Sequence, residues 1–409
     1  MKNLKVINFG PVKNIDIELR DINIFIGEQS IGKSTIAKLI TIFTDYVSLM
    51  KLAVGGYEMW EMQLDEYNLG VYKQQPYSIF YQQEEDDCII NIKIENGSFS
   101  MTFIKNGQKI TSDNDIIAEL FQLKKIHHDS FNDELRKLLS LEDKQTSARQ
   151  VLELMNNSLY VPAERIIYST ISKLMPALTI AKSSVPTILL RFMVELMNAK
   201  NEYPEFEIPL LNISYKWKND TDYFVIGENG ELPLTAASSG IQSTVPLLLV
   251  LHYAIHKREF TSFVLEEPEC NLFPEKQVEL LKHIIALIKS ENRTLTITTH
   301  SPYLLSDLNN YLYAGSLIEK YGDRIRASVE SVISESLCIK PSECAVFSLG
   351  ERINENQAYC KSLLDEESGM IDFNSLDNVS IQMGEEFEAL ENAYIEMLRE
   401  ENNNGFQCN

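Results

Sequence analysis

The stretch that decides the fold of this chain is Gly27-Glu28-Gln29-Ser30-Ile31-Gly32-Lys33-Ser34-Thr35, which reads G-x-x-x-x-G-K-S. This is the pattern of a phosphate-binding loop, or P-loop. Residues 21–26 before it are apolar and β-branched and predict a strand, and residues 34–43 after it have the spacing of a buried helix that we expect to continue to residue 54. A Gly-rich turn before an ordinary helix is the alternative, but every fixed position and both flanks match the P-loop.

Phosphate binding explains why these residue types occur together. Two glycines let the backbone turn its N–H groups toward phosphate oxygens, and the helix N-terminus adds unpaired N–H groups with a positive dipole end. We expect Lys33 to lie between the β- and γ-phosphates of ATP and the Ser34 hydroxyl to ligate Mg²⁺. The expected nucleotide-binding residues of the loop are Gly27, Gln29, Ser30, Ile31, Gly32, Lys33, Ser34 and Thr35.

Composition limits the possible functions. The 409 residues carry a net charge of −22, which is unusual for a protein that grips duplex DNA over a broad face. The six cysteines form no C-x-x-C pair, so we expect reduced thiols and no structural metal. No apolar run reaches 18 residues, and the N-terminal residues lack the apolar core of a signal peptide. We therefore expect a cytoplasmic protein without a membrane segment.

The fold class expected from the pattern is α/β, with four parts along the chain. Residues 1–110 alternate in polarity around the P-loop and predict an ATPase lobe with β-hairpins, including one at the Asn96-Gly97 turn. Residues 111–207 have mainly helical spacing and predict a helical insertion. Residues 208–312 predict strands and then the second ATPase lobe, and residues 313–409 predict an extension that docks a partner.

Three further motifs follow in the second lobe. Ser238-Ser239-Gly240 precedes an apolar helix, residues 263–265 are an apolar strand that ends at Glu266-Glu267, and residues 295–299 are a strand that ends at His300. Each alone has a structural alternative: a small-residue turn, a buried strand that meets a polar turn, or a structural histidine. Their order after a P-loop is more specific, because adjacent acids and a strand-end histidine are the groups that hold Mg²⁺ and orient water.

With these motifs the chain resembles the ABC-type ATPases of the SMC, RecF and OLD group. The stretch from Leu265 to Pro274 is similar to that group's Glu-Glu-Pro-Glu segment, although Phe273 stands where His is usual and Glu266 where most members have Asp. Thr299-His300-Ser301 is similar to the switch motif, and Ser238-Ser239-Gly240 to a shortened signature motif. The segment from Tyr160 to Arg165 resembles one in Septu-type and related defence ATPases.

The resemblance implies an ABC-type head with an antiparallel β subdomain and a helical insertion. It also implies that two heads dimerise around two ATP molecules, so that Ser238, Ser239 and Gly240 meet the partner's nucleotide. Glu267 would act as general base or orient the attacking water, with Glu269 as an alternative, and His300 would sense the γ-phosphate. Glu266 would hold Mg²⁺ through water, and Asn271 would lie in the segment that crosses the dimer.

Residues 306–409 contain no D-x-D pair, so we expect no nuclease site in this chain. The leading hypothesis is the ATPase subunit of an antiphage system (Septu-like, PARIS-like or retron-associated) that regulates a separate effector, a nuclease. The main alternative is a RecF-like repair ATPase that binds DNA itself. A transporter nucleotide-binding subunit fits the insertion poorly, and a non-hydrolysing scaffold would not need the set Lys33, Glu267 and His300.

Overall fold

A computed structural model describes most of the chain. The residues described are 1–85, 87–110, 116, 157–168, 186–227, 230–257, 260–350, 359–365, 367–372 and 382–395. Most of the helical insertion expected at residues 111–207 lies outside them. Its described part includes β8 (Ser158–Val161) and α8 (Thr187–Glu202).

The N-terminal part forms an antiparallel sheet in which strand polarity alternates as the sequence predicts. Its order is β2-β1-β4-β5-β6-β7, with β1 Lys2–Phe9, β2 Val12–Leu19, β4 Ser78–Glu85, β5 Cys88–Glu95, β6 Ser98–Lys105 and β7 Gln108–Ile110. The predicted hairpin at Asn96-Gly97 is confirmed, and both residues have positive φ angles (46° and 83°), which a tight hairpin turn requires.

The central sheet carries the P-loop. Its order is β16-β15-β3-β14-β13-β8, with β3 Ile22–Gly27, β13 Ser262–Glu266, β14 Thr294–Thr298, β15 Cys344–Leu349 and β16 Cys360–Ser362. All neighbouring pairs are parallel except β15 and β16. The carboxyl ends of β3, β14 and β13 therefore meet at one edge, where parallel sheets place their ligands.

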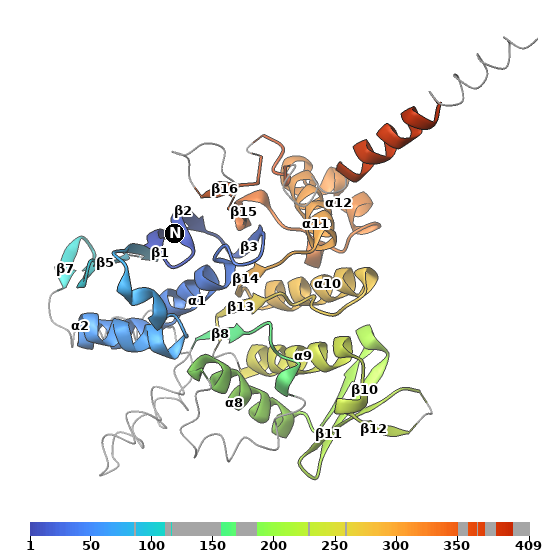
Figure 1. Ribbon diagram of the computed structural model, residues 1–409, viewed down its shortest axis with the longest axis horizontal. Helices are drawn as coiled ribbons and strands as arrows, with labels where there is room; N and C mark the ends of the chain where they lie inside the picture. The colour runs from blue at the N-terminus through green and yellow to red at the C-terminus, as the bar shows by residue number, and fades with distance from the viewer. Residues whose placement is uncertain are drawn as a thin grey trace, which may run out of the picture.

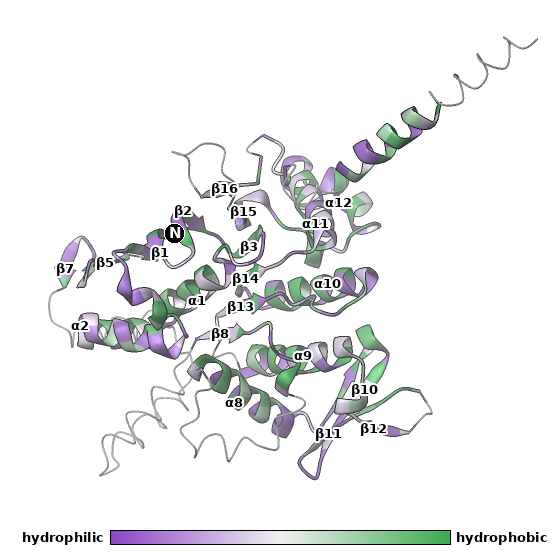
Figure 2. Cartoon of the chain, viewed as in Figure 1, coloured by the Kyte–Doolittle hydropathy of each residue, from purple (hydrophilic) through white to green (hydrophobic). Residues whose placement is uncertain are grey.

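Both faces of this sheet are covered, so the protein is an α/β structure (Figure 1). One core contains Phe25 and Val264 and joins the sheet to α1 (Lys33–Thr44), α2 (Tyr46–Glu66) and the N-terminal sheet. The other contains Ile24 and Leu265 and joins it to α9 (Ser239–Lys257), α10 (Pro274–Ser290) and α11 (Pro302–Tyr321). Figure 2 shows hydrophobic residues along these helices and strands.

The remaining elements lie around the central sheet. A four-stranded antiparallel sheet beside α8 and α9 has the order β12-β11-β10-β9, with β9 Glu205–Ile208, β10 Ile213–Lys218, β11 Thr221–Val225 and β12 Glu231–Pro233 (Figure 1). The short helix α12 (Asp323–Glu330) follows α11, and residues 382–395 are helical.

The structure corrects two expectations about boundaries. A single helix was expected over residues 34–54, but α1 ends at Thr44 and α2 starts at Tyr46, with 79° between them. Asp45 causes the break because its carboxylate accepts hydrogen bonds from the Val47 amide (3.4 Å) and the Ser48 hydroxyl (3.1 Å), as an N-cap does. The central sheet also extends past residue 312, since β15 pairs with β3 along its length.

In the described ranges, a single helix long and apolar enough to cross a membrane does not occur. The bent pair α1 and α2 passes the same length and composition criteria when both are taken together.

Candidate functional site

The P-loop connects β3 to α1 in a conformation that only glycine adopts easily at two positions. Gly27 and Gly32 have φ angles of 139° and 107°, and Ser30 has a φ of 63°. A Cβ atom on Gly27 would lie 2.6 Å from the carbonyl oxygen of Leu349, and one on Gly32 would lie 2.7 Å from Cγ2 of Val12. The sheet and the first hairpin therefore hold the loop closely. The side chains of Gln29, Ser30 and Ser34 are exposed.

Lys33 closes over the loop that precedes it. Its Nζ donates hydrogen bonds to the carbonyl oxygens of Gly27 (2.8 Å) and Glu28 (2.7 Å). Burial lowers the pKa of Lys33 to about 8, and the carboxylates of Glu267 and Glu266 act in the opposite direction. The ammonium group thus lies within electrostatic reach of both acids, and an ammonium is a common ligand of phosphate oxygens.

Glu266 ends β13 and is buried. Burial raises the pKa of its carboxyl group, while hydrogen bonds from the hydroxyls of Tyr160 and Ser34 lower it. Its Oε1 is a buried atom without a hydrogen-bond partner in the part of the chain that the structure describes. A carboxylate with an unused oxygen beside a hydroxyl is the donor set that Mg²⁺ takes when phosphates complete its shell. The residues at this position therefore fit the expected metal.

Glu267 follows in an unusual backbone conformation, with φ of 41°. Its Oε1 lies 3.4 Å from Nε2 of His300, and its Oε2 accepts a hydrogen bond from the Cys270 thiol (3.2 Å). The hydrogen bond with His300 is the main reason that the pKa of Glu267 falls to about 2. A carboxylate can orient a water molecule or accept its proton, so both roles expected for Glu267 are compatible with this position beside His300.

Glu269, the alternative base, has a different position. Its Oε1 accepts hydrogen bonds from the Thr299 hydroxyl and from the backbone amide of His300 (3.3 Å). Burial raises the pKa of its carboxyl group. Glu269 therefore joins the turn after β13 to the turn after β14 and holds His300 in place.

The Ser238-Ser239-Gly240 turn packs against Asn271. Ser238 and Ser239 are exposed, whereas Gly240 is buried, and a Cβ atom on it would lie 2.7 Å from the carbonyl oxygen of Asn271. Asn271 is itself in the left-handed region, with φ of 65°. The predicted residues thus form two groups: Lys33, Ser34, Glu266, Glu267 and His300 around the strand ends, and the signature turn with Asn271.

Two residues at the site are absent from the sequence-based set. Arg165 is completely buried and donates hydrogen bonds to the carbonyls of Glu266 (2.7 Å) and Glu267 (2.9 Å). Tyr359 donates one to the carbonyl of Ile31 in the P-loop. The motif-like segment from Tyr160 to Arg165 could have indicated the role of Arg165. Tyr359 is an isolated tyrosine near the C-terminus, and no sequence pattern indicated its role.

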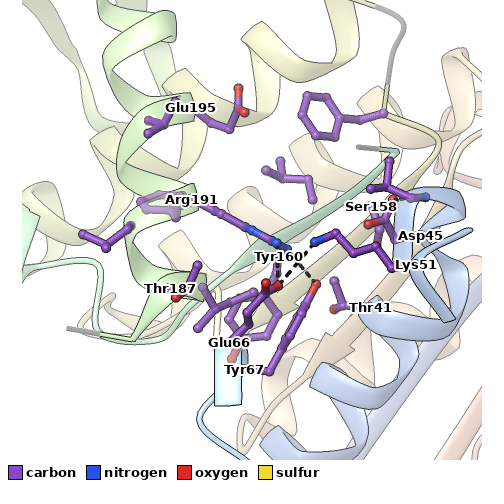
Figure 3. Close-up of a pocket in the computed structure, with 17 residues that line it drawn as sticks. Thr41, Asp45, Lys51, Glu66, Tyr67, Ser158, Tyr160, Thr187, Arg191 and Glu195 are labelled. Carbon is purple, nitrogen blue, oxygen red and sulfur yellow. Dashed lines mark hydrogen bonds and ion pairs between the residues drawn. The ribbon is translucent and has the colours of Figure 1, made fainter. Parts of the chain in front are cut away.

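A cavity of about 410 Å³ is lined by residues of α1, α2, β8 and α8 (Figure 3). Lys51 and Arg191 both point to the carboxylate of Glu66, at 3.7 and 2.7 Å, and the carboxyl groups of Asp45 and Glu195 also line the cavity, so acids offset its two cations and make it a poor phosphate site. Tyr160 lines the cavity and also hydrogen-bonds Glu266, so the cavity lies next to the residues around Glu266.

The chain is similar to one protein family and to several solved structures. The model of the AAA ATPase domain family matches residues 1–183 and 162–305. No curated protein matches the chain. Among solved structures, the Smc head bound to the C-winged helix domain of ScpA is 13% identical, with a TM-score of 0.37, and the similarity covers 75% of this chain and 90% of that one.

Two further structures are similar over the same share of this chain. The SMC head domain from Thermotoga maritima is 14% identical, with a TM-score of 0.33, and 90% of it is covered. The recombination mediator protein RecF is also 14% identical, with a TM-score of 0.33, and 92% of it is covered.

Proposed function

Because the chain belongs to the AAA ATPase domain family, we propose that it binds ATP with Mg²⁺ at its P-loop and hydrolyses it as an ABC-type ATPase. The observation that carries this proposal is the convergence of four groups at one edge of the central sheet. Lys33 lies within electrostatic reach of Glu266 and Glu267, and the Ser34 hydroxyl hydrogen-bonds Glu266. A cation, a metal ligand pair and a water-orienting acid are the groups that phosphoryl transfer to water requires.

Each residue has one role in the proposed reaction. The P-loop amides and Lys33 bind the β- and γ-phosphates, and Ser34 and Glu266 hold Mg²⁺, which would neutralise charge on the phosphate oxygens. Glu267 orients the attacking water. Its carboxylate also contacts His300, the residue proposed to sense the γ-phosphate. Phosphate release measured with wild type and Lys33→Ala tests this: the variant should neither bind nor hydrolyse ATP, and an unchanged ATP affinity would refute the P-loop assignment.

We further propose that the complete site contains two subunits. Ser238 and Ser239 are exposed and Gly240 packs against Asn271, whereas Lys33 in the P-loop of the same chain lies within electrostatic reach of Glu266 and Glu267. An exposed helix start is suited to a phosphate that another subunit brings. ATP would then be a ligand of the dimer as well as a substrate.

The finer proposal is that this ATPase regulates a separate effector, a nuclease, in antiphage defence. It is supported by the resemblance of the motifs to OLD-like defence ATPases and by the lack of a D-x-D pair in residues 306–409. The helix at residues 382–395 is a suitable docking element, since all its residues are exposed, with Phe387, Leu390 and Tyr394 at 63%, 71% and 60%. Figure 2 shows hydrophobic and hydrophilic residues alternating along it.

The negative charge of this helix indicates which kind of partner it would bind. Residues 382–395 contain four glutamates and neither Lys nor Arg, and the whole chain has a net charge of −22. Docking on the chain's own acidic body or on a second copy would bring like charges together. A helix of this length is only marginally stable alone, so a partner with an apolar groove and a basic rim would stabilise it. A nuclease has such basic surface because it binds phosphates.

Purification of the tagged protein from its native host, followed by mass spectrometry, tests the finer proposal. A basic protein encoded by a neighbouring gene should co-purify, and the pair together should protect against phage. Isolation of the ATPase alone, with no protection by the operon, would contradict it. Salt-sensitive DNA binding by the ATPase itself, strengthened by ATP, would favour the RecF-like alternative.

A further inference from the structure

The side chain of Arg165 donates hydrogen bonds to five backbone carbonyls. A residue that binds a metal or a phosphate would not need these bonds. The guanidinium of Arg165 is 0% exposed. Nη1 donates to Pro162 (2.8 Å) and Glu266 (2.7 Å), Nη2 donates to Glu267 (2.9 Å) and Pro268 (3.1 Å), and Nε donates to Ser243 (3.3 Å). Guanidinium has five N–H groups in a planar fork, and these five carbonyls account for all of them. No part of the side chain remains for a ligand.

Three of these carbonyls belong to the turn that carries the catalytic acid. Glu266, Glu267 and Pro268 are consecutive, and Glu267 has a φ of 41°, a left-handed conformation that is unfavourable for a non-glycine residue. Hydrogen bonds from a charged donor to these three carbonyls oppose this strain. The guanidinium therefore holds the backbone in the conformation that directs the Glu267 carboxylate at His300.

The remaining contacts connect this turn to other elements. Ser243 lies in the first turns of α9, the helix that begins at the signature turn, and its carbonyl accepts the hydrogen bond from Nε of Arg165. Gly240 at the start of α9 also contacts Asn271, four residues after Glu267. The start of α9 thus contacts the acid turn twice, once through Arg165 and once directly.

We propose that Arg165 is a positioning residue that couples the signature helix α9 to the backbone of Glu267, so that engagement of the signature turn by a second subunit regulates hydrolysis. This inference rests on the proposed ATPase function and adds to it a residue that touches neither nucleotide nor metal. When α9 moves against the partner's nucleotide, the carbonyl of Ser243 moves with it, and the rigid guanidinium transmits that movement to the carbonyls of Glu266 and Glu267.

The test uses Arg165→Lys, which keeps the charge but replaces the planar fork by one ammonium group. Single-turnover hydrolysis should fall about 100-fold, as expected for a reacting group displaced by about 1 Å, while the ATP dissociation constant stays unchanged. Arg191→Lys is the control, since Arg191 is a partly buried arginine that pairs with Glu66 and lines the cavity beside β8. Its hydrolysis rate should equal that of wild type.

A double variant separates positioning from general destabilisation. If Arg165 acts through Glu267, Arg165→Lys should reduce the residual rate of Glu267→Gln by much less than it reduces the wild-type rate. Equal reductions in the two backgrounds, or a wild-type rate for Arg165→Lys alone, would overturn the inference and leave the ATPase function intact.

Hydrogen exchange provides a readout that does not depend on the variant. In wild type, ATP should protect residues 239–250 and 262–272 over the same range of ATP concentration, because the guanidinium couples them. Protection of only one segment would overturn the inference, even if Arg165→Lys fails to fold. If wild type binds ATP without hydrolysing it, the proposed function is wrong, and this exchange experiment still decides the coupling.

Discussion

The hydroxyl of Tyr359 donates a 2.6 Å hydrogen bond to the carbonyl oxygen of Ile31, which joins the P-loop to a residue 328 positions away. The neighbouring backbone supports the same contact, because the Gly350 amide donates to the carbonyl of Tyr359 (2.8 Å) and Leu349 ends the strand beside Gly27. The C-terminal part of the chain therefore helps to shape the loop that binds phosphate.

Tyr359→Phe should weaken ATP binding without changing the fold. Loss of one hydrogen bond costs about 0.5–1.5 kcal/mol, so we expect a roughly two- to tenfold higher dissociation constant in a titration with a fluorescent ATP analogue. Tyr321→Phe, at an exposed position on α11, is the control and should bind as wild type does. An equal affinity for both variants would show that the contact does not shape the loop.

Glu267→Gln should bind ATP and hydrolyse it about 10²–10⁴-fold more slowly, because an amide cannot orient or deprotonate water as a carboxylate does. The variant should also accumulate as an ATP-bound dimer in light scattering after size-exclusion chromatography. Glu275→Gln, at an exposed acid in the first turn of α10, is the control. Hydrolysis at the wild-type rate by Glu267→Gln would move the catalytic acid elsewhere.

Lys33 should make ATP binding depend on pH in the alkaline range. In the free protein burial lowers its pKa to about 8, and bound phosphates favour the charged form, so binding takes up a proton above this value. Affinity should fall as the pH rises, by at most about tenfold per pH unit. Calorimetry at pH 8.5 in buffers of different ionisation enthalpy measures the uptake, which should be much smaller at pH 7. Affinity that does not change up to pH 9.5 would contradict this.

Gly240→Ala should impair the dimer while the monomer still binds ATP. The added Cβ would lie 2.7 Å from the carbonyl oxygen of Asn271, so the signature turn must shift away from its place. Gly384→Ala is the control because a Cβ there meets no atom within 4 Å. The measurement is the dimer fraction with ATP in sedimentation velocity, made in the Glu267→Gln background. An unchanged dimer fraction would exclude the turn from the subunit interface.

Phe387→Glu with Leu390→Glu should abolish capture of the basic partner. Both side chains are exposed on the helix at residues 382–395, and glutamate there removes the apolar contact that a groove would cover. ATP hydrolysis should stay at the wild-type rate. Asn392→Ala on the same helix is the control and should retain the partner. Capture that survives the double substitution would place the docking surface elsewhere.

The place of the candidate site at one edge of the sheet was predictable because its signals are local. A strand followed at once by a glycine loop, by two acids or by a histidine is recognisable within ten residues, and parallel strands then bring Lys33, Glu267 and His300 to one edge. The roles of Arg165 and Tyr359 depend instead on pairing between distant segments. The pairing of β15 with β3 cannot be predicted from the residues next to them in the sequence. The same holds for the contacts between Arg165 and its five carbonyls.

The break at Asp45 was missed for a different reason. Apolar residues continue through Thr44 and Tyr46 in helical spacing, and periodicity alone therefore predicts one helix. The Asp45 carboxylate also accepts a hydrogen bond from the backbone amide of Asn157 (3.2 Å). A tertiary contact thus strengthens a capping signal that is weak in the sequence.

The position of β14 between β3 and β13 has a consequence for how this protein can change shape. The P-loop strand and the acid strand are separated by two inter-strand spacings, about 10 Å in all, and backbone hydrogen bonds set this width. Substitutions in side chains leave it unchanged, and so does the loss of a γ-phosphate. A change of shape driven by the proposed ATP hydrolysis would therefore have to occur in turns and helices that move over a sheet of constant width.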